Sequence, residues 1–542
     1  YFRGPLYPYL LAFLLKITGG SLFWIRLLQA VIGSGSAVLI FLLGGRMFSL
    51  QVGLIAGLAY AAYGTIIFYE TMLLIPVLFI FLNLLAVFLL LRFEGSENWR
   101  HWLLAGLMVG LSAIARPNIL LLAPIFMLWM YFTFGKIKAH KRLVYAGIYL
   151  VGILIPVFSV TVRNYAVTGE AVLISSQGGV NLYIGNNPDT EGLTMLMPEV
   201  ALDESLPWTE FTAATRKAAE REVGHPLTAA EESAFWTGKA LRFIISNPGR
   251  FITITFKKTV YFLLGFENSD QTDIYYSRTF SSLLSILLWK SPISFPFGLV
   301  LPMAAVGMIL CWRRRRELTL FYLFIVGYIP TVVLFLVTAR HRLPVVPFLL
   351  LFAGAGTLAL IKYARTKDWR KFTGYLALVF ILMILGNRTY FDIGFENTAQ
   401  IHFNLALTYE RQGDLIKAEH EYKQALEANP GSRAALNNLG YVQYRLGKLN
   451  DAMLNFQTAI RTDPEFADAY NNLGLVYEAQ ENLTHARRMY QRAIELDPNL
   501  YTAYINLGDV SLAENDFAEA EQFYIQGREL DTSRKNAFTK LG

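Results

Sequence analysis

The chain has 542 residues, of which 54% are hydrophobic and only 16% are charged, and its mean hydropathy is +0.38. A soluble protein of this length does not need so much apolar surface, so the composition indicates a protein that crosses a membrane several times. The net charge is +7, but Lys and Arg cluster beside apolar segments, which argues for membrane topology and against nucleic acid as a partner. The single cysteine, Cys311, excludes an internal disulfide framework and a cysteine-based zinc site.

The chain begins at Tyr1, within the stretch YFRGPLYPYL, and has no signal-like segment. This start indicates a fragment whose N-terminal part lies upstream. Residues 6–18 mix apolar and polar side chains, which predicts a helix lying in the membrane interface. We therefore assign residues 1–26 to the end of a first outer loop that contains an interfacial helix.

Ten apolar segments predict membrane-spanning helices in two groups, one within 27–162 and the other within 296–387. The two segments that flank Arg116 are short, so tilted, broken or partly inserted helices are all open there. Between the groups, residues 163–295 are polar and predict an outer loop domain with interfacial helices of its own. The ten segments are 27–44, 51–69, 71–91, 102–115, 118–134, 144–162, 296–312, 318–338, 343–362 and 373–387.

Lys and Arg are distributed unequally between alternate short loops. One set of loops holds sixteen of them, in 45–50, 92–101, 135–143, 312–317 and 362–371. The opposite set holds three, namely Arg116, Arg340 and Arg342. Because positively charged loops stay in the cytoplasm, the first set is predicted to be cytoplasmic. The chain is therefore predicted to lie in the cytoplasmic (inner) membrane, with 163–295 and everything after 388 on the outer, periplasmic side.

From Glu396 onward the amino-acid composition changes, and particular residue types recur every 34 positions. The recurring residues are Pro430, Pro464 and Pro498; Asn404, Asn438, Asn472 and Asn506; Ala418, Ala452, Ala486 and Ala520; and Tyr422, Phe456, Tyr490 and Tyr524. Small residues let paired helices approach, aromatic rings fill the space between repeats, and proline ends each second helix. Residues 396–542 are thus predicted to form about four tetratricopeptide (TPR) repeats, with a short final helix near 533–541. In TPR solenoids the concave face usually binds peptide.

Arg340, His341 and Arg342 form a basic trio directly before an apolar segment, on the predicted outer face, where cations are disfavoured. Arginine offers a planar, permanently charged fork to phosphate oxygens, and histidine donates or exchanges a proton. The trio therefore predicts a clamp for a lipid-linked phosphate at headgroup depth. The alternative is that these side chains only anchor the end of a helix in the interface.

Two further outward residues are candidates for the same site. Arg116, in the stretch AIARPNILL, is predicted to bind the donor phosphate, and the alternative is a cap of a broken helix or a lipid anchor. Glu70, in IIFYETMLL, is the only acid in a short outward loop between two spans. An acid at membrane depth predicts a functional site, so Glu70 is a catalytic candidate, whereas a position at the surface would make it an ordinary charge.

The loop that starts at Arg163 combines turn signals with amides and an aromatic ring. Amides and aromatic rings bind sugars by hydrogen bonding and stacking, which predicts a sugar or acceptor site, and the alternative is that they only shape turns. The candidates are Arg163, Asn164, Asn181, Tyr183, Asn186 and Asn187. No metal-ligand cluster stands out, so no cofactor is assigned, and a divalent metal stays open.

The stretches FRGPLYPYLLAFLLKITGG and RLLQAVIGSGSAVLIFLLGGRMF resemble the segment after the first outer loop of GT-C membrane glycosyltransferases. The resemblance is to the family 39 type, which includes protein O-mannosyltransferases and lipid A aminoarabinose transferases. GLSAIARPNILLLAP, RNYAVTGEAVLISSQGGVNLYIGNN and ARHRLPVVPFLLLFAG resemble later landmarks of bacterial members that carry C-terminal TPR repeats. The resemblance implies an all-α polytopic membrane protein with a GT-C-like transmembrane bundle, an extramembrane loop domain and a C-terminal α-solenoid.

The same resemblance implies transfer of a sugar from a polyprenyl-phosphate carrier to a protein hydroxyl or a glycolipid, with the repeats recruiting the acceptor or a partner protein. It implies that Arg340 and Arg342 meet the donor phosphate. It also implies an essential Asp in the first outer loop, which is expected upstream of Tyr1; otherwise the chain as given is inactive. Two other functions stay open, a non-enzymatic membrane-anchored TPR scaffold and a lipid-linked glycan polymerase or ligase.

Overall fold

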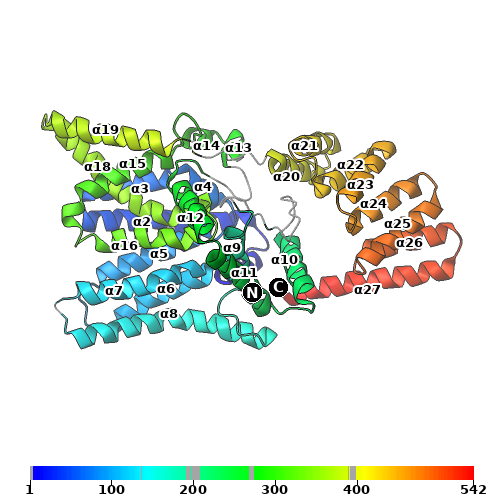
Figure 1. Ribbon diagram of the computed structural model, residues 1–542, viewed down its shortest axis with the longest axis horizontal. Helices are drawn as coiled ribbons and strands as arrows, with labels where there is room; N and C mark the ends of the chain where they lie inside the picture. Colours follow the sequence, from blue (N-terminus) through cyan, green and yellow to red (C-terminus); the bar gives the residue numbers. More distant parts are fainter. Residues whose placement is uncertain are drawn as a thin grey trace. The chain divides into compact units, whose positions relative to one another are not determined.

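The computed structural model describes residues 4–135, 137–190, 197, 208–267, 274–388, 390 and 398–541. It divides into two compact units (Figure 1). The membrane unit contains Tyr1–Val200 and Ala213–Ile393, and the repeat unit contains Ala201–Thr212 and Gly394–Gly542. Within the described residues the regular elements are helices, apart from one isolated bridge between Trp289 and Phe295. The all-α fold predicted from the sequence is confirmed.

The first half of the membrane unit is a series of helices: α1 (Leu6–Ile17), α2 (Leu22–Met47), α3 (Leu50–Ala61), α4 (Gly64–Thr71), α5 (Pro76–Arg92), α6 (Trp99–Ala115), η1 (Pro117–Leu122), α7 (Ala123–Thr133) and α8 (Ala139–Thr168). Polar caps set several of their ends. The Ser49 hydroxyl accepts a hydrogen bond from the Val52 N–H at the start of α3, and the Asn98 side chain does the same for Arg100 in α6. Helix α8 ends at Gly169, which adopts a left-handed φ of 73°.

The second half begins with the shorter helices α9 (Gly178–Gly185), α10 (Trp208–Val223), α11 (Ala229–Ser246), α12 (Pro248–Leu263), α13 (Ile274–Ser277), η2 (Arg278–Phe280) and α14 (Ser282–Leu287). It continues with α15 (Phe297–Leu310), η3 (Trp312–Arg314), α16 (Thr319–Val333), α17 (Ala339–Arg342), η4 (Leu343–Val345), α18 (Val346–Arg365) and α19 (Trp369–Gly386). Thr228 and Glu231 form a reciprocal capping box at the start of α11.

Within the part of the chain that the structure describes, four helices are long and apolar enough to cross a membrane, namely Leu22–Met47, Ala139–Thr168, Ala339–Arg365 and Trp369–Gly386. Helices α3 and α4 pass the same test only together and are bent by 50°. The sequence predicted one continuous span over 51–69, but the structure breaks it at Ala62 and Tyr63. The break is where Gly64 lies against the backbone carbonyl of Leu287, a close approach that leaves no room for a side chain. Shorter apolar helices occupy the predicted spans near 76–92, 117–133, 297–310 and 319–333.

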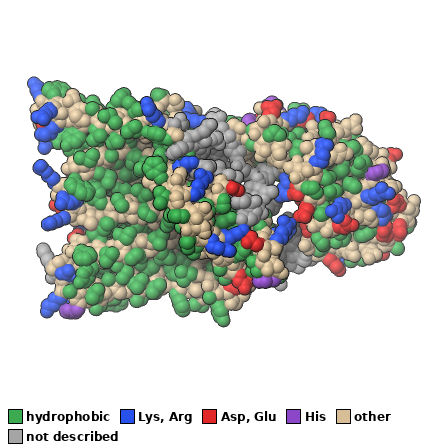
Figure 2. All heavy atoms as spheres, viewed as in Figure 1, with side chains coloured by type: hydrophobic (Ala, Val, Ile, Leu, Met, Phe, Trp, Pro, Cys, Tyr) green, Lys and Arg blue, Asp and Glu red, His purple; other side chains and the backbone are tan. Residues whose placement is uncertain are grey.

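Small residues bring several of these helices together. A Cβ added to Gly106 on α6 would lie 3.0 Å from the Cα of Gly152 on α8, so the two backbones pack directly against each other. The outer surface is apolar, as the 67% exposed Phe158 on α8 shows, and hydrophobic side chains cover the visible face of the membrane unit in Figure 2. Such a surface is suited to contact with lipid.

The two ends of the membrane unit differ in charge. The loops that join α7 to α8 and α18 to α19 lie at the left end in Figure 1. Lys and Arg side chains gather at that end in Figure 2. Helices α4, α9, α12, α13 and α14 lie toward the other end (Figure 1). The charge asymmetry between alternate loops is therefore an asymmetry between the two ends of this unit.

The repeat unit consists of helix pairs, α20 (Thr398–Arg411) with α21 (Leu415–Ala428), α22 (Arg433–Arg445) with α23 (Leu449–Thr462), α24 (Ala467–Ala479) with α25 (Leu483–Leu496), and α26 (Tyr501–Ala513) with α27 (Phe517–Leu541). The four predicted repeats are confirmed. The separate final helix predicted near 533–541 is wrong, because α27 runs through those residues. The position that holds Pro498 in the preceding repeat is Thr532 here, so no proline ends the helix.

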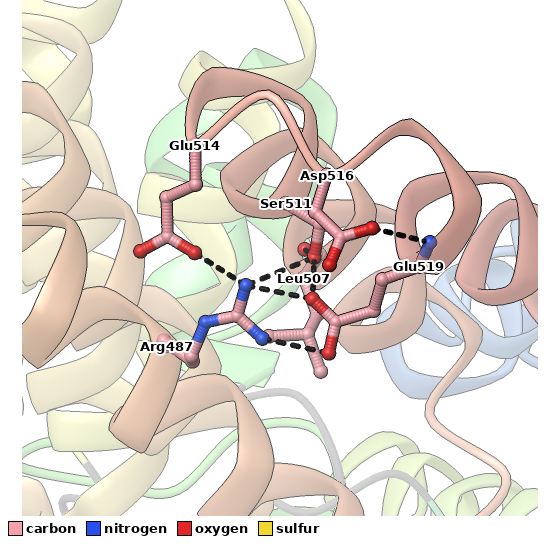
Figure 3. A network of polar contacts seen from close by, with 6 residues as sticks. All are labelled: Arg487, Leu507, Ser511, Glu514, Asp516 and Glu519. Carbon is pink, nitrogen blue, oxygen red and sulfur yellow. Dashed lines mark hydrogen bonds and ion pairs between the residues drawn. The ribbon is translucent and has the colours of Figure 1, made fainter.

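Polar contacts join the third and fourth pairs of the repeat unit (Figure 3). Arg487 on α25 donates two hydrogen bonds to Glu519 on α27, with N–O distances of 3.0 and 2.8 Å. It also donates to Glu514 and to the Ser511 hydroxyl. That hydroxyl donates in turn to Glu519, so one arginine connects three helical segments.

The junction between the first and second pairs uses the same register with the charges exchanged. Here Glu419 on α21 occupies the position of Arg487, and it accepts a hydrogen bond of 2.6 Å from Lys448 and a weaker one of 3.5 Å from Gln443. Burial raises the pKa of Glu419, but the hydrogen bonds from Lys448 and Lys423 outweigh it and lower the pKa to about 2. The first junction thus pairs an acid of the earlier repeat with a base of the later one, whereas the last junction pairs a base of the earlier repeat with acids of the later one.

Candidate functional site

The basic trio lies on a single helical turn. Helix α17 follows Thr338, whose hydroxyl lies 3.0 Å from Nδ1 of His341 and whose carbonyl accepts a hydrogen bond from the His341 N–H. The turn continues through η4 into α18. Arg340 and His341 are half-buried, whereas Arg342 is only 2% exposed. The three side chains therefore have different surroundings although they are neighbours in the sequence.

Arg116 interacts with His341, the middle member of the trio. It ends α6 in an extended conformation, with φ of −150°. Both Arg116 and Arg340 interact electrostatically with His341, and Arg116 hydrogen-bonds the Tyr328 hydroxyl. Three basic groups from two distant parts of the sequence thus meet at one place. We call Arg116, Arg340 and His341 the cation cluster.

Two neutral side chains border the cation cluster. The Asn118 amide donates to the Tyr328 hydroxyl on α16 and to the Thr331 hydroxyl, each at 3.3 Å. Sequence reasoning missed Asn118 and Tyr328 because both lie within apolar segments; the available signal was the position of Asn118, two residues after Arg116. Like charges repel each other, so a cluster of cations with hydrogen-bonding neighbours is suited to hold an anion.

Arg342 differs from the other two members of the trio, because its guanidinium is engaged inside the protein. One nitrogen lies 2.6 Å from a carboxylate oxygen of Glu267. The guanidinium also donates to the backbone carbonyls of Leu264, at 2.5 Å, and Phe266, at 2.7 Å, and it lies 3.8 Å from the centre of the Phe297 ring. Phosphate binding by Arg342 stays a prediction, and in this structure the arginine is buried and paired with an internal carboxylate.

Glu267 is a residue that sequence reasoning missed. One of its carboxylate oxygens accepts a hydrogen bond of 3.1 Å from the Thr65 hydroxyl on α4, and its backbone N–H donates to the Tyr275 hydroxyl at 3.0 Å. The residue is 1% exposed. It stands in the polar stretch GFENSDQ, where an acid gives no sign of burial, so only the structure pairs it with Arg342.

Glu70 lies in the last turn of α4 and is half-buried. Its carboxylate fills the space beside Gly33 on α2, where any added Cβ would collide with it, and it interacts electrostatically with Tyr60. These neighbours belong to α2 and α3 and not to the cation cluster. A catalytic role for Glu70 stays a prediction.

The amides of the loop after Arg163 point largely into the fold. Asn164 donates to the carbonyl of Val172 at 2.9 Å, Asn186 to that of Leu334 at 2.8 Å, and Asn187 to that of Tyr183 at 3.0 Å. All three amides, and Tyr183, are buried. These contacts favour the turn-shaping alternative for the four residues, and sugar binding by them stays a prediction.

Two members of the loop set are more accessible. Asn181 is half-buried, and Arg163 is exposed, with its guanidinium 5.4 Å from the centre of the Tyr9 ring. Both stay candidates for contact with a sugar or an acceptor. Among the residues that the structure describes, no group of three or more His, Cys, Asp and Glu side chains could hold a metal ion.

The chain combines an all-α membrane unit that contains the cation cluster with a unit of paired helical repeats. Residues 3–161 match the family described as dolichyl-phosphate-mannose-protein mannosyltransferase. Tetratricopeptide families match residues 403–456, 444–481, 467–500 and 489–522. The resemblance drawn from the sequence is confirmed: the chain combines a mannosyltransferase-like membrane segment with TPR repeats.

Solved structures similar to this chain include TPR proteins. A crystal structure of MamA is 24% identical, covers 26% of this chain and 82% of its own, and has a TM-score of 0.24. The first TPR of Spaghetti (RPAP3), bound to an HSP90 peptide, is 25% identical over 22% of this chain and 94% of its own, with a TM-score of 0.21. A thermophilic TPR protein from Thermus thermophilus is 22% identical over 25% of this chain and 75% of its own, with a TM-score of 0.24. No curated protein matches the chain.

Proposed function

We propose that this protein is a glycosyltransferase that moves a sugar from a polyprenyl-phosphate carrier to a hydroxyl of a protein or a glycolipid. The observation that carries the proposal is the cation cluster, in which Arg116 and Arg340 both interact electrostatically with His341. The match of residues 3–161 to the mannosyltransferase family supports this reaction class and favours mannose as the first sugar to test.

The reaction needs a stabilised leaving group. A carboxylate takes the proton of the acceptor hydroxyl, the hydroxyl oxygen attacks the anomeric carbon, and the bond from that carbon to the phosphate oxygen breaks. The polyprenyl phosphate leaves with the bonding electrons and therefore gains negative charge. The cation cluster would stabilise that charge as it develops. The general base is expected in the first outer loop upstream of Tyr1, and Glu70 is the candidate within the chain.

The excess of Lys and Arg in one set of loops supports an orientation in which the other end of the membrane unit, with α4, α9 and α12, faces the periplasm. The cation cluster would then lie at the outer headgroup level of the inner membrane, where a lipid-linked phosphate is found. The repeats, following α19, would be on the same side. There they would recruit the acceptor polypeptide or a partner protein, which is the usual work of TPR repeats.

Turnover of polyprenyl-phosphate mannose by a chain that includes the first outer loop tests the proposal. A charge-assisted hydrogen bond to phosphate contributes roughly 1.5–3 kcal/mol, so Arg340→Ala and Arg116→Ala should each lower kcat/KM about ten- to a hundredfold. Arg340→Lys keeps the charge but loses the planar fork and should also be impaired. The control is Arg314→Ala, which removes an exposed arginine paired only with Glu317 and a backbone carbonyl. Unchanged turnover in the Arg116 and Arg340 variants would contradict the proposal and leave the scaffold alternative.

A further inference from the structure

Helical geometry places Arg340 and Arg342 on nearly opposite sides of α17. Successive residues of a helix are rotated by about 100°, so two residues that are two positions apart differ in direction by about 200°. The contacts of Arg342 agree with this geometry, since it pairs with Glu267, whereas Arg340, like Arg116, interacts electrostatically with His341. A rotation of this one turn would move both arginines together.

The Glu267 carboxylate, which pairs with Arg342, is itself held in place. Thr65 on α4 binds one carboxylate oxygen and Arg342 binds the other. The backbone just before Glu267 is fixed as well, because the Gly265 N–H donates to the carbonyl of Gly386 at 2.7 Å. Arg342 additionally donates to the carbonyls at 264 and 266, which belong to the same turn. The carboxylate is therefore a rigid reference point, connected to α4 and to the end of α19.

Burial makes this arrangement specific. The side chains of Arg342 and Glu267 are 3% and 0% exposed, so water cannot replace either partner when the pair separates. The guanidinium donates to several acceptors, which defines its orientation more tightly than a single contact between charges. Few rotations of α17 can satisfy all of these bonds at once.

From this arrangement we infer that Glu267 and Arg342 are positioning residues: their buried ion pair sets the rotation of α17 and thereby aims Arg340 and His341 at the phosphate of the donor. The inference rests on the proposed function and extends it to two residues that do not touch the substrate. It also gives the loop domain a part in the reaction, since Glu267 follows α12 within residues 163–295.

Neutralising Glu267 separates this role from direct phosphate binding by Arg342. If Arg342 were a phosphate ligand, Glu267 would compete with the phosphate for it, and Glu267→Gln would leave binding unchanged or tighten it. If the pair positions α17, Glu267→Gln removes the charge that holds Arg342 and loosens the turn, so binding weakens. The two roles thus predict effects of opposite sign from the same variant.

The experiment measures binding of undecaprenyl phosphate, without a sugar, to the full chain in detergent. We expect Glu267→Gln to weaken binding tenfold or more. Arg342→Gln should weaken it similarly, and Arg342→Lys should recover part of the loss. The double variant Glu267→Gln with Arg342→Gln should lose little more than either single variant, because both act through one contact. Arg314→Gln, which alters an exposed ion pair with Glu317, is the control and should bind normally.

A milder variant covers the case in which Glu267→Gln does not fold. Thr65→Val removes one hydrogen bond to Glu267 and leaves all charges in place, and it should weaken binding about threefold. Normal or tighter binding in a folded Glu267→Gln variant, or normal binding in Thr65→Val when the former does not fold, overturns the inference. Arg340→Gln distinguishes the two proposals: normal binding in that variant contradicts the phosphate site itself, whereas weak binding there with normal binding in Glu267→Gln contradicts the positioning role alone.

Discussion

The membrane unit and the repeat unit each contain an arginine bound to a carboxylate, but in different surroundings. In the membrane unit the side chains of Arg342 and Glu267 are at most 3% exposed. In the repeat unit Arg487 and Glu519 are 21% and 34% exposed. The buried arginine donates to backbone carbonyls of one turn, whereas Arg487 bridges side chains of neighbouring repeats.

This difference determines what each contact does. A buried charge that loses its partner cannot be solvated, so the membrane-unit pair excludes other arrangements and specifies geometry. A half-exposed pair exchanges partners with water at a modest cost, so the repeat-unit contacts add stability and do little to specify a unique arrangement. An arginine–glutamate pair therefore fixes the orientation of a helical turn in the membrane unit, whereas in the repeat unit it stabilises the contact between neighbouring repeats.

The largest effect is expected when the buried pair is broken on one side. Arg342→Met leaves the Glu267 carboxylate buried and unpaired, and it should lower the free energy of unfolding by about 3–5 kcal/mol. Replacing both residues, as Arg342→Met with Glu267→Leu, should recover most of that loss. Denaturant unfolding in detergent micelles measures both. Equal stability of the single and double variants would show that the charges are not coupled.

An intermediate effect is expected at a buried cation for which the described residues show a backbone carbonyl and no carboxylate as partner. Lys258 on α12, a helix that is not among the candidate spans, is 0% exposed, and its ammonium donates to the carbonyl of Gly185 at 2.6 Å. Burial lowers the pKa of Lys258 to about 7. At pH values between this pKa and the ordinary lysine pKa, the unfolded chain binds more protons than the folded one. The free energy of unfolding therefore rises with pH in that range.

The slope from this one group should approach about 1.4 kcal/mol per pH unit above pH 7, giving roughly 2 kcal/mol between pH 7 and pH 9. Lys258→Met, which keeps the apolar stem, should lack this contribution. Unfolding of both proteins at pH 7, 8 and 9 makes the comparison. Parallel pH profiles for the two would mean that Lys258 titrates normally in the folded chain.

The smallest effect is expected at the repeat junction. Arg487→Met should lower the free energy of unfolding of the repeat unit by about 1–2 kcal/mol, because it removes charged hydrogen bonds that are only partly buried. Arg492→Met is the matched control, since Arg492 is paired with Glu495 on the same helix with both side chains about half exposed, and it should cost less than about 0.5 kcal/mol. A loss above about 3 kcal/mol for Arg487→Met, the range of a buried pair, would remove the contrast between the units.

Sequence reasoning succeeded where a pattern repeats. The spacing of Pro430, Pro464 and Pro498 marks the ends of α21, α23 and α25, because the same helix pair is built each time from the same signals. The apolar segments likewise gave the helices of the membrane unit. The break between α3 and α4 escaped prediction, since it depends on Gly64 meeting the backbone of Leu287, far away in the sequence.

The candidate site was predicted only in part. Arg116, Arg340 and His341 were visible as basic residues in loops predicted to face outward, and in the structure both arginines interact electrostatically with His341. Asn186 and Asn187 looked like sugar-binding amides, but residue type alone does not show whether an amide meets a ligand or a backbone carbonyl. The partner of Arg342 was invisible because Glu267 lies 75 positions away in the sequence.

The exchange of charges between the repeat junctions has a consequence for the evolution of this chain. Glu419 meets Lys448 at one junction, whereas Arg487 meets Glu514 and Glu519 at another. A duplication that placed the fourth helix pair directly after the first would bring Glu419 against two acids, and one that placed the second after the third would bring Arg487 against Lys448. The equivalent position in the second pair is the neutral Met453, so the two charged junctions are not interchangeable and the order of the helix pairs decides whether their charges attract or repel.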